Sequence, residues 1–168
     1  MRLAILTISD AGVRGDRKDT SGDAVAAWGN SRHYFLAARE IVSDDSVSIV
    51  RQLVQWCDSD AADLVLTTGG TGLSSRDITP EATLAALERE APGIAERIRV
   101  SCMQSFPRAA LSRGIAGARN RTLIVNLPGS TSGVRDALAA LDPIIDHAVA
   151  ILRGDVTDHS AAAPSRIP

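Results

Sequence analysis

A glycine-rich stretch near the middle of the chain has the residue types of an anion-binding loop. It reads Thr67-Thr68-Gly69-Gly70-Thr71-Gly72 and directly follows the apolar residues Leu64-Val65-Leu66. Glycines after a strand let the backbone turn tightly and bring its N–H groups close to an anion, and the threonines add hydroxyl donors. A tight connection between a strand and a helix would use the same glycines, so the run alone indicates only an anion near a helix start.

Residues just downstream make this hypothesis more specific. Arg76 could clamp a phosphate, and Asp77 could hold a divalent cation through its oxygens. The next residues, Thr79-Pro80-Glu81, offer a capping hydroxyl, a proline at the first helical position and an acid, so they predict a helix whose positive end points back at the glycines. Leu73, rather than a lysine, follows Gly72, which excludes the P-loop of common NTPases.

Two carboxylates, Asp44 and Asp45, follow another apolar run and precede a predicted helix. Either could simply begin that helix, a frequent position for aspartate. Alternatively, one of them faces Asp77 across the ligand edge of a sheet, where two carboxylates and several phosphates would bind Mg²⁺. The sequence does not decide between Asp44 and Asp45.

A third polar group ends the last apolar run, in Asn126-Leu127-Pro128-Gly129-Ser130. The Pro-Gly pair favours a turn, and Asn126 and Ser130 offer polar atoms beside it. An ordinary turn at the end of a strand gives the same pattern. The pairs Ser9-Asp10 and Ser112-Arg113 are weaker candidates of the same kind.

These groups must be positioned by alternating strands and helices. Buried strands are predicted over Leu3–Ile8, Leu36–Val42, Leu64–Thr67 and Leu123–Leu127. Helices are predicted over Asp23–Asn30, from a Ser46 cap to Cys57, from a Thr79 cap to about Glu90, over Ile94–Met103, and over Val134–Leu152 with a bend at Pro143. This alternation predicts one α/β doubly wound domain over residues 1–155, a mostly parallel sheet with helices on both faces. Residues 156–168 are expected to form a loosely ordered tail.

Ligands of such folds gather beyond the carboxyl ends of the strands. The loops expected there are Ser9–Gly22, Ser43–Asp45, Thr68–Asp77 and Pro128–Ser132, and all four are rich in glycine, hydroxyls or carboxylates. The candidate groups are therefore expected to share one edge of the sheet.

Composition narrows the functions that this chain can have. The net charge is −2 and Lys18 is the only lysine, which argues against sequence-independent nucleic-acid binding. Cys57 and Cys102 are too few for a disulfide framework and fit a reducing compartment. The sequence has no signal-like region and no apolar stretch of membrane-spanning length, so a cytoplasmic protein with no membrane partner is expected.

The motifs together resemble those of the MogA/MoaB family of molybdenum-cofactor biosynthesis, which includes a domain of gephyrin. The similarity covers roughly residues 2–154. It rests on the stretch from Thr67 to Thr83 and on four shorter motifs: Thr7-Ile8-Ser9-Asp10, Asp19-Thr20-Ser21-Gly22, Leu111-Ser112-Arg113-Gly114 and Asn126-Leu127-Pro128-Gly129-Ser130. Ala11-Gly12 and Asn30–Phe35 depart from the common pattern, which leaves the nucleotide contacts open.

The resemblance implies a molybdopterin adenylyltransferase that uses ATP and Mg²⁺ and releases pyrophosphate. It implies that Asp44 and Asp77 are the catalytic, metal-side carboxylates. The pterin, phosphate and nucleotide contacts would come from Ser9, Asp10, Thr68, Gly69, Gly70, Thr71, Gly72, Arg76, Ser112, Arg113, Asn126, Pro128, Gly129 and Ser130. It also implies a homotrimer, in some members paired into a hexamer, and hand-over to a molybdate-insertion protein.

Two alternative functions are compatible with the same fold. One is a catalytically silent, MoaB-type pterin-binding protein that acts as carrier or assembly partner. The other is a different nucleotide substrate, as in the related competence-damage protein domain.

Overall fold

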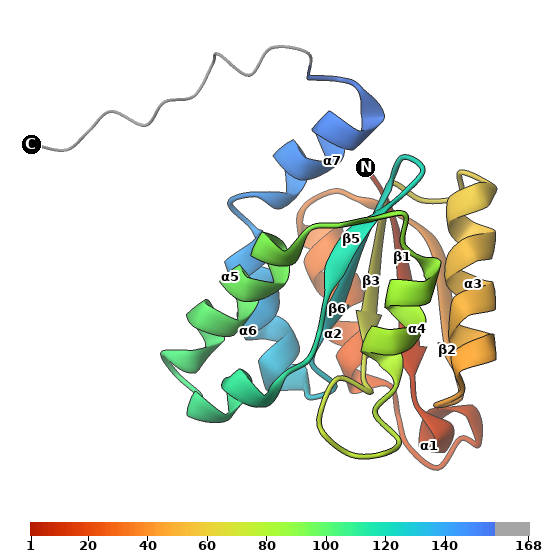
Figure 1. Ribbon diagram of the computed structural model, residues 1–168, viewed down its shortest axis with the longest axis vertical. Coiled ribbons are helices and arrows are strands. Elements are labelled where there is room, and N and C mark those ends of the chain that lie inside the picture. Colours follow the sequence, from red (N-terminus) through yellow and green to blue (C-terminus); the bar gives the residue numbers. More distant parts are fainter. Residues whose placement is uncertain (157–168) are drawn as a thin grey trace, which may run out of the picture.

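A six-stranded sheet runs through the part of the chain that the computed structural model describes, residues 1–156 (Figure 1). The strands are β1 (Arg2–Ile8), β2 (Phe35–Val42), β3 (Leu64–Thr68), β4 (Arg89–Glu90), β5 (Ala116–Arg119) and β6 (Thr122–Leu127). They lie in the order β2-β1-β3-β6-β5-β4. Strands β2, β1, β3 and β6 are parallel to one another, whereas β5 runs antiparallel to both β6 and β4. The predicted doubly wound, mostly parallel fold is confirmed.

Helices cover both faces of this sheet. They are α1 (Asp10–Val13), α2 (Thr20–Ser31), α3 (Ser46–Asp58), α4 (Thr79–Ala86), α5 (Pro92–Met103), the 3-10 helix η1 (Pro107–Leu111), α6 (Thr131–Leu141) and α7 (Ile145–Arg153). The break at Pro143 separates α6 from α7, so the predicted bent helix is two helices. No helix among residues 1–156 combines the length and the hydropathy needed to cross a membrane.

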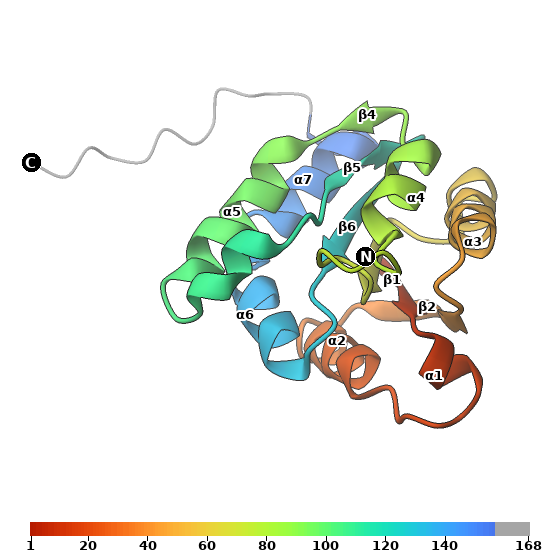
Figure 2. The ribbon, with the colours of Figure 1, turned by 60° about the horizontal axis from the view of Figure 1, so that its bottom comes forward.

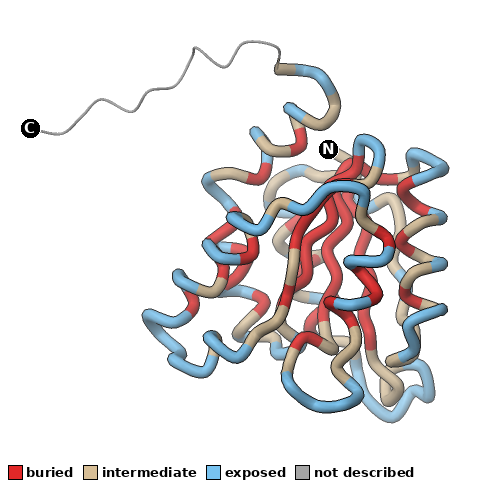
Figure 3. Tube along the Cα trace, in the orientation of Figure 1, coloured by how far each residue is buried: buried red, intermediate tan, exposed pale blue. Residues whose placement is uncertain are grey.

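Alternating residues of the strands build two separate cores. In β1, Leu3 and Ile5 pack with residues of α2, α5, α6 and α7. Ala4 and Leu6 point to the other face, where they pack with residues of α3 and α4. The central strands are accordingly buried along their whole length (Figure 3).

The register of the parallel strands brings their carboxyl ends to one level. Ile8 lies beside Val42, Thr7 beside Thr68, and Thr68 beside Leu127. The loops that follow β1, β2, β3 and β6 therefore meet at one end of the sheet, at the bottom of Figure 1 and toward the viewer in Figure 2. This confirms that the candidate groups share one edge.

Several local predictions were wrong. Strand β2 is not a buried strand, because it lies at the edge of the sheet and leaves Phe35 and Leu36 exposed. Strands β4 and β5 were not predicted, since β4 has two residues and Ala116-Gly117-Ala118-Arg119 lacks the bulky side chains of a typical strand.

The starts and ends of several helices also differ from the prediction; α2 and α6 each begin three residues earlier, at Thr20 and Thr131. Asp45, not Ser46, caps α3, because its carboxylate accepts a hydrogen bond from the Ser48 N–H at 2.8 Å. The Thr79 hydroxyl does not cap α4 but donates to the Gly69 carbonyl. Helix α4 ends at Ala86 rather than near Glu90, since the chain turns extended at Leu87 and enters β4. The predicted tail falls, from residue 157 onward, outside the described residues.

An ionic cluster fastens α7 to the end of the sheet away from these loops. Asp63, at the start of β3, accepts two hydrogen bonds of 2.7 Å from the backbone N–H and guanidinium of Arg2, and Arg153 of α7 lies 3.4 Å away. Burial alone would raise the pKa of Asp63, but Arg2 outweighs it and the pKa is lowered. A hydrogen bond from Arg153, with a further one from Arg2, lowers the pKa of neighbouring Asp60 to about 2.

This cluster predicts a loss of stability in acid. Because the folded-state pKa values are lowered, the stabilisation is fully present above the unfolded-state value of about 3.9 and is lost as pH falls through the folded values. Urea denaturation should show wild type weakening between about pH 5 and pH 2.5, and Asp63→Asn weakening less over that interval because part of the effect is already gone. The variant Asp16→Asn, which removes an exposed carboxylate elsewhere, should follow wild type. An unchanged pH dependence in Asp63→Asn would contradict this account.

Candidate active site

Two glycine loops lie against each other at the carboxyl end of the sheet. Gly69 and Gly70 have φ angles of 99° and 63°, in the left-handed region that favours glycine. A Cβ atom on Gly69 would lie 2.4 Å from the Ile8 carbonyl oxygen, and one on Gly129 would lie 3.2 Å from the Gly69 Cα. The Thr68 hydroxyl joins the loops by donating to the Pro128 carbonyl at 2.7 Å. The loops approach this closely because neither carries a side chain at the contact.

Their backbone amides are available to a ligand. Within residues 1–156, the N–H groups of Gly70, Thr71, Gly129 and Ser130 donate no hydrogen bond. Free amides at such a turn attract anions. Helix α6 begins directly after Ser130, and the hydroxyls of Thr20 and Thr131 share a hydrogen bond of 2.8 Å, so the starts of α2 and α6 lie together. The positive ends of both helices border the amides.

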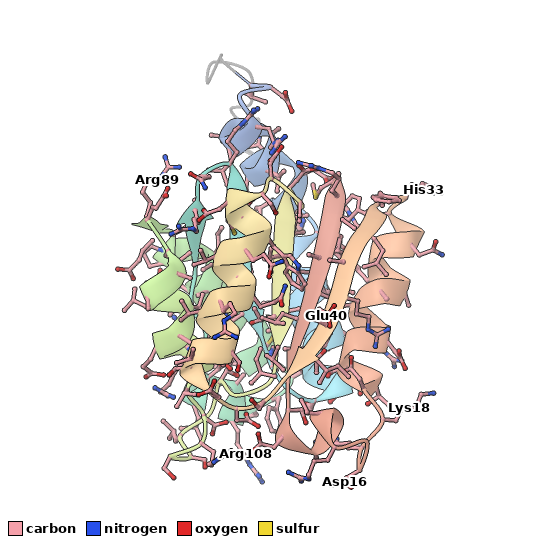
Figure 4. All side chains as sticks on the ribbon, turned by 90° about the vertical axis from the view of Figure 1, so that its right-hand side faces the viewer. Asp16, Lys18, His33, Glu40, Arg89 and Arg108 are labelled. Atoms are coloured by element: carbon pink, nitrogen blue, oxygen red, sulfur yellow. The ribbon has the colours of Figure 1, made fainter. Side chains whose placement is uncertain are left out.

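Two cavities meet on this surface, which we call the shared floor and define as Gly70, Gly129 and Ser130. A polar cavity of about 430 Å³ is lined by the floor and by Thr7, Ile8, Ser9, Gly12, Arg17, Lys18, Asp19, Thr20, Ser21, Asp44, Thr68 and Gly69. A mainly apolar cavity of about 580 Å³ extends on the other side, along α5, η1 and α6. Figure 4 shows Lys18 and Arg108, one from each cavity, at the same end of the molecule.

Asp44 and Asp10, which follow β2 and β1, form two reciprocal hydrogen bonds. The Asp10 N–H donates to Asp44 Oδ2 at 2.9 Å, and the Asp44 N–H donates to Asp10 Oδ1 at 3.0 Å. The other oxygen of Asp10 pairs with the Arg76 guanidinium. Asp44 Oδ1 forms no hydrogen bond within the described chain, and Asp44 lines the polar cavity. Asp10 and Arg76 thus orient Asp44 and connect its loop to the glycine loop.

The neighbouring Asp45 has a different role. Its carboxylate caps α3 and does not line either cavity. The geometry therefore favours Asp44 as the carboxylate that faces a ligand.

Asp77 lines the apolar cavity close to the floor. Its Oδ2 accepts a hydrogen bond from the Ser74 N–H at 2.8 Å, while no partner within residues 1–156 contacts its Oδ1. A Cβ atom on Gly72 would lie 2.9 Å from Asp77 Oδ2, so the third glycine makes room for this carboxylate. Asp44 and Asp77 line different cavities, so a single metal bound by both remains a prediction.

Two predicted contact residues lie behind the site rather than in it. Arg113 donates to the Gly72 carbonyl at 2.7 Å and also contacts Glu81 and the Asp77 carbonyl, and it lines neither cavity. Asn126 is buried, with hydrogen bonds of 2.9 Å to the hydroxyls of Thr67 and Thr83. Arg113 thus braces the loop that carries the glycines, and Asn126 joins the strand before that loop to the helix after it.

Asp10 and Arg76, also predicted as contact residues, pair with each other and line neither cavity. The other predicted residues line a cavity, although some of their polar atoms are engaged. Ser9 and Ser130 cap α1 and α6 with their hydroxyls, and the Ser112 hydroxyl accepts from the Gly114 N–H. Ser9 lines the polar cavity, whereas Thr71, Gly72, Ser112 and Pro128 line the apolar one.

Several cavity residues were not among the predicted site residues. Asp19 caps α2 and accepts hydrogen bonds from Thr7 and Arg39; burial alone would raise its pKa, but these partners lower it and keep the carboxylate ionised. Lys18, beside it, also lines the polar cavity, and its position directly before Asp19-Thr20-Ser21-Gly22 is a sequence signal that could identify it. Phe106, Arg108 and Asp136 carry no motif that could have identified them.

Comparison with known proteins identifies the family. A family model described as "Probable molybdopterin binding domain" matches residues 4–147. The chain belongs to this family.

Individual members of the molybdopterin-binding family are similar to this chain over most of its length. A molybdopterin adenylyltransferase of Helicobacter pylori strain J99 is 38% identical over 159 residues, 92% of this chain and 89% of that protein. The crystal structure of the molybdopterin biosynthesis enzyme MoaB from Thermus thermophilus superposes with a TM-score of 0.86 at 48% identity, covering 91% of this chain and 96% of that one. The molybdopterin biosynthesis Mog protein of Mycobacterium ulcerans gives 0.85 at 36% identity, covering 90% and 98%. The resemblance inferred from the motifs is confirmed.

The position of Asn126 in this molybdopterin-binding domain predicts a structural role. Asn126→Ala would leave the buried Thr67 and Thr83 hydroxyls and the Ile115 N–H without their partner. We expect the free energy of unfolding to fall by about 3 kcal/mol, measured by urea denaturation. The matched variant Asn30→Ala, on the exposed surface of α2, should stay within about 0.5 kcal/mol of wild type. Wild-type stability in Asn126→Ala would show that its hydrogen bonds do not hold the loop.

Proposed function

We propose that this chain is a molybdopterin adenylyltransferase of molybdenum-cofactor biosynthesis, which transfers AMP from ATP to the terminal phosphate of molybdopterin. The observation that carries the proposal is the shared floor, where a polar and an apolar cavity meet over free backbone amides. Two substrates bound in the two cavities would have their phosphates in contact at this point. The likeness to a named molybdopterin adenylyltransferase over 92% of the chain supports the same reaction.

The reaction requires one bond to form and one to break. A phosphate oxygen of molybdopterin attacks the α-phosphorus of ATP, and the bond from that phosphorus to the bridging oxygen breaks, so pyrophosphate leaves with the electron pair. No protein nucleophile is needed, and the main contribution of the protein is to position two anions in line. The amides of Gly70, Gly129 and Ser130 and the starts of α2 and α6 would offset the negative charge that gathers there.

Asp44 and Asp77 are suited to magnesium that is shared with phosphates. Each has one carboxylate oxygen fixed by a backbone N–H and one without a partner in residues 1–156. The described chain contains no group of three or more His, Cys, Asp or Glu side chains that could hold a metal alone. Mg²⁺ in phosphoryl-transfer sites typically takes one or two carboxylates, and substrate oxygens and water complete its coordination. When bound, the ion would neutralise phosphate charge and polarise the α-phosphate.

Other features of the proposal follow the family. We propose a cytoplasmic homotrimer, in which the adenylated product passes to a molybdate-insertion protein. The alternative is a catalytically silent, MoaB-type molybdopterin-binding protein that acts as carrier or assembly partner. Two carboxylates with available oxygens at the floor favour the enzyme, since a carrier has no use for metal-side groups.

The adjacent aspartates supply a matched test. Purified protein is given molybdopterin, ATP and Mg²⁺, and adenylated molybdopterin and pyrophosphate are measured. We expect Asp44→Asn and Asp77→Asn each to lower turnover by about 100-fold or more, because each removes the charge that would hold the metal. Asp45→Asn should keep full activity, since asparagine also caps helices.

Three outcomes would decide against the proposal. Absence of turnover in the wild type, together with tight molybdopterin binding, would support the carrier. Normal turnover by Asp77→Asn would remove that carboxylate from the reaction. Equal losses in Asp44→Asn and Asp45→Asn would show that the loop, rather than the Asp44 charge, is required.

A further inference from the structure

One carboxylate in the apolar cavity has no partner and no role in the chemistry above. Asp136 of α6 lines this cavity with Ile98, Cys102, Phe106, Ala109 and Leu111. Asp136 is exposed at the mouth of the cavity, and within residues 1–156 it forms neither a hydrogen bond nor an ion pair. Burial raises the pKa of the Cys102 thiol, and the charge of Asp136 raises it further, so the carboxylate and this cavity residue are close.

The two arginines that line the same cavity do not pair with Asp136. The Arg99 guanidinium donates to the Gly114 carbonyl at 2.7 Å, and Arg108 lies over the Phe106 ring at 5.9 Å. Asp136 is therefore an acceptor-only group, without an ion pair in the described chain, beside the apolar side chains of Ile98, Phe106 and Ala109.

Asp136 lies on the same helix face as the residues that lead to the shared floor. Ser132 and Gly133 line the same cavity and precede Asp136 by four and three residues, so the three residues share one face of α6. Asp136 lies about 8 Å along the helix axis from Thr131, where the helix begins beside the floor. A ligand with a flat ring system at one end and a phosphate at the other would span this distance.

We propose that Asp136 is the specificity-determining residue that binds the 2-amino-4-oxopyrimidine edge of the pterin, which places the pterin in the apolar cavity and the nucleotide in the polar one. This inference rests on the proposed function. The pterin edge presents two donors side by side, the 2-amino group and N3–H, and a carboxylate accepts both in the bidentate manner in which it accepts a guanidinium. Adenine presents its amino donor beside the N1 acceptor, so one carboxylate oxygen would face a lone pair.

The polar cavity fits the remaining substrate. Lys18 and Arg17 line it, together with the start of α2 and the free oxygen of Asp44. These groups suit a triphosphate and its metal, whereas the apolar walls around Asp136 suit a ring. Guanine has the same donor pair as a pterin, so a guanine nucleotide must be compared directly.

The test compares two ligands that differ only at the edge in question. Binding of 6-hydroxymethylpterin and of 6-hydroxymethyllumazine, which has oxygen in place of the 2-amino group, is measured by ligand fluorescence with full-length protein. We expect wild type to prefer the pterin by about 10- to 100-fold, the range for a hydrogen bond to a charged group. Asp136→Asn should lose most of this preference and keep wild-type affinity for MgATP. The control Glu96→Gln, which removes an exposed carboxylate on α5 outside the cavity, should keep the preference.

Each other outcome would overturn the proposal. No saturable pterin binding, equal affinity for the two ligands, or a preference retained in Asp136→Asn would show that Asp136 does not read this edge. Equal losses of pterin and MgATP affinity in Asp136→Asn would indicate a structural role. Guanosine 5′-monophosphate binding as tightly as the pterin would assign the cavity to a nucleotide.

The experiments distinguish a failure of this inference from a failure of the proposed function. If wild type adenylylates molybdopterin but does not distinguish pterin from lumazine, the function stands and the role of Asp136 falls. If the preference depends on Asp136 but no adenylated product forms, the recognition stands and the transferase does not.

Discussion

The close contact between two backbone loops, Gly69-Gly70 and Gly129, is the constraint on which the rest of this structure depends. Two anionic substrates can react only if their charges are offset where they meet, and a chain with net charge −2 and one lysine cannot do so with a broad basic surface. Amides and helix starts can supply the missing positive charge, but only where the backbone itself forms the surface. Gly69 cannot carry a side chain because the Ile8 carbonyl lies too close.

Arginines and hydroxyls hold the loops in this position. Arg113 braces the glycine loop, and Asn126 joins β3 before it to α4 after it. The Thr79 hydroxyl donates to the Gly69 carbonyl, and the Asp10–Arg76 pair connects the loop to the end of β1. Motif residues are therefore of two kinds, those that line the cavities and those that fix the backbone of the cavity walls. The loop motif is long because both kinds of residue are needed.

Much of this arrangement was predictable from the sequence. The four long strands and the loops after them follow from apolar runs and their polar ends, and the edge rule of parallel sheets brings those loops together. The choice between Asp44 and Asp45 was not predictable, because both types of role suit aspartate and only the direction of each side chain separates them. The roles of Arg113 and Asn126 depend on partners 41 and 59 residues away, a distance over which local patterns carry no information. Asp136 could not be singled out from the sequence, because it is an exposed carboxylate on an amphipathic helix and only the fold places it beside the apolar cavity.

The most direct test of the central claim is a crystal structure of the protein with MgATP or a non-hydrolysable analogue. We expect the α-phosphate to lie within hydrogen-bonding distance of the amides of Gly70, Gly129 or Ser130, with the β- and γ-phosphates toward Lys18 and Asp44. An α-phosphate bound away from these amides, with the floor left to solvent, would contradict it.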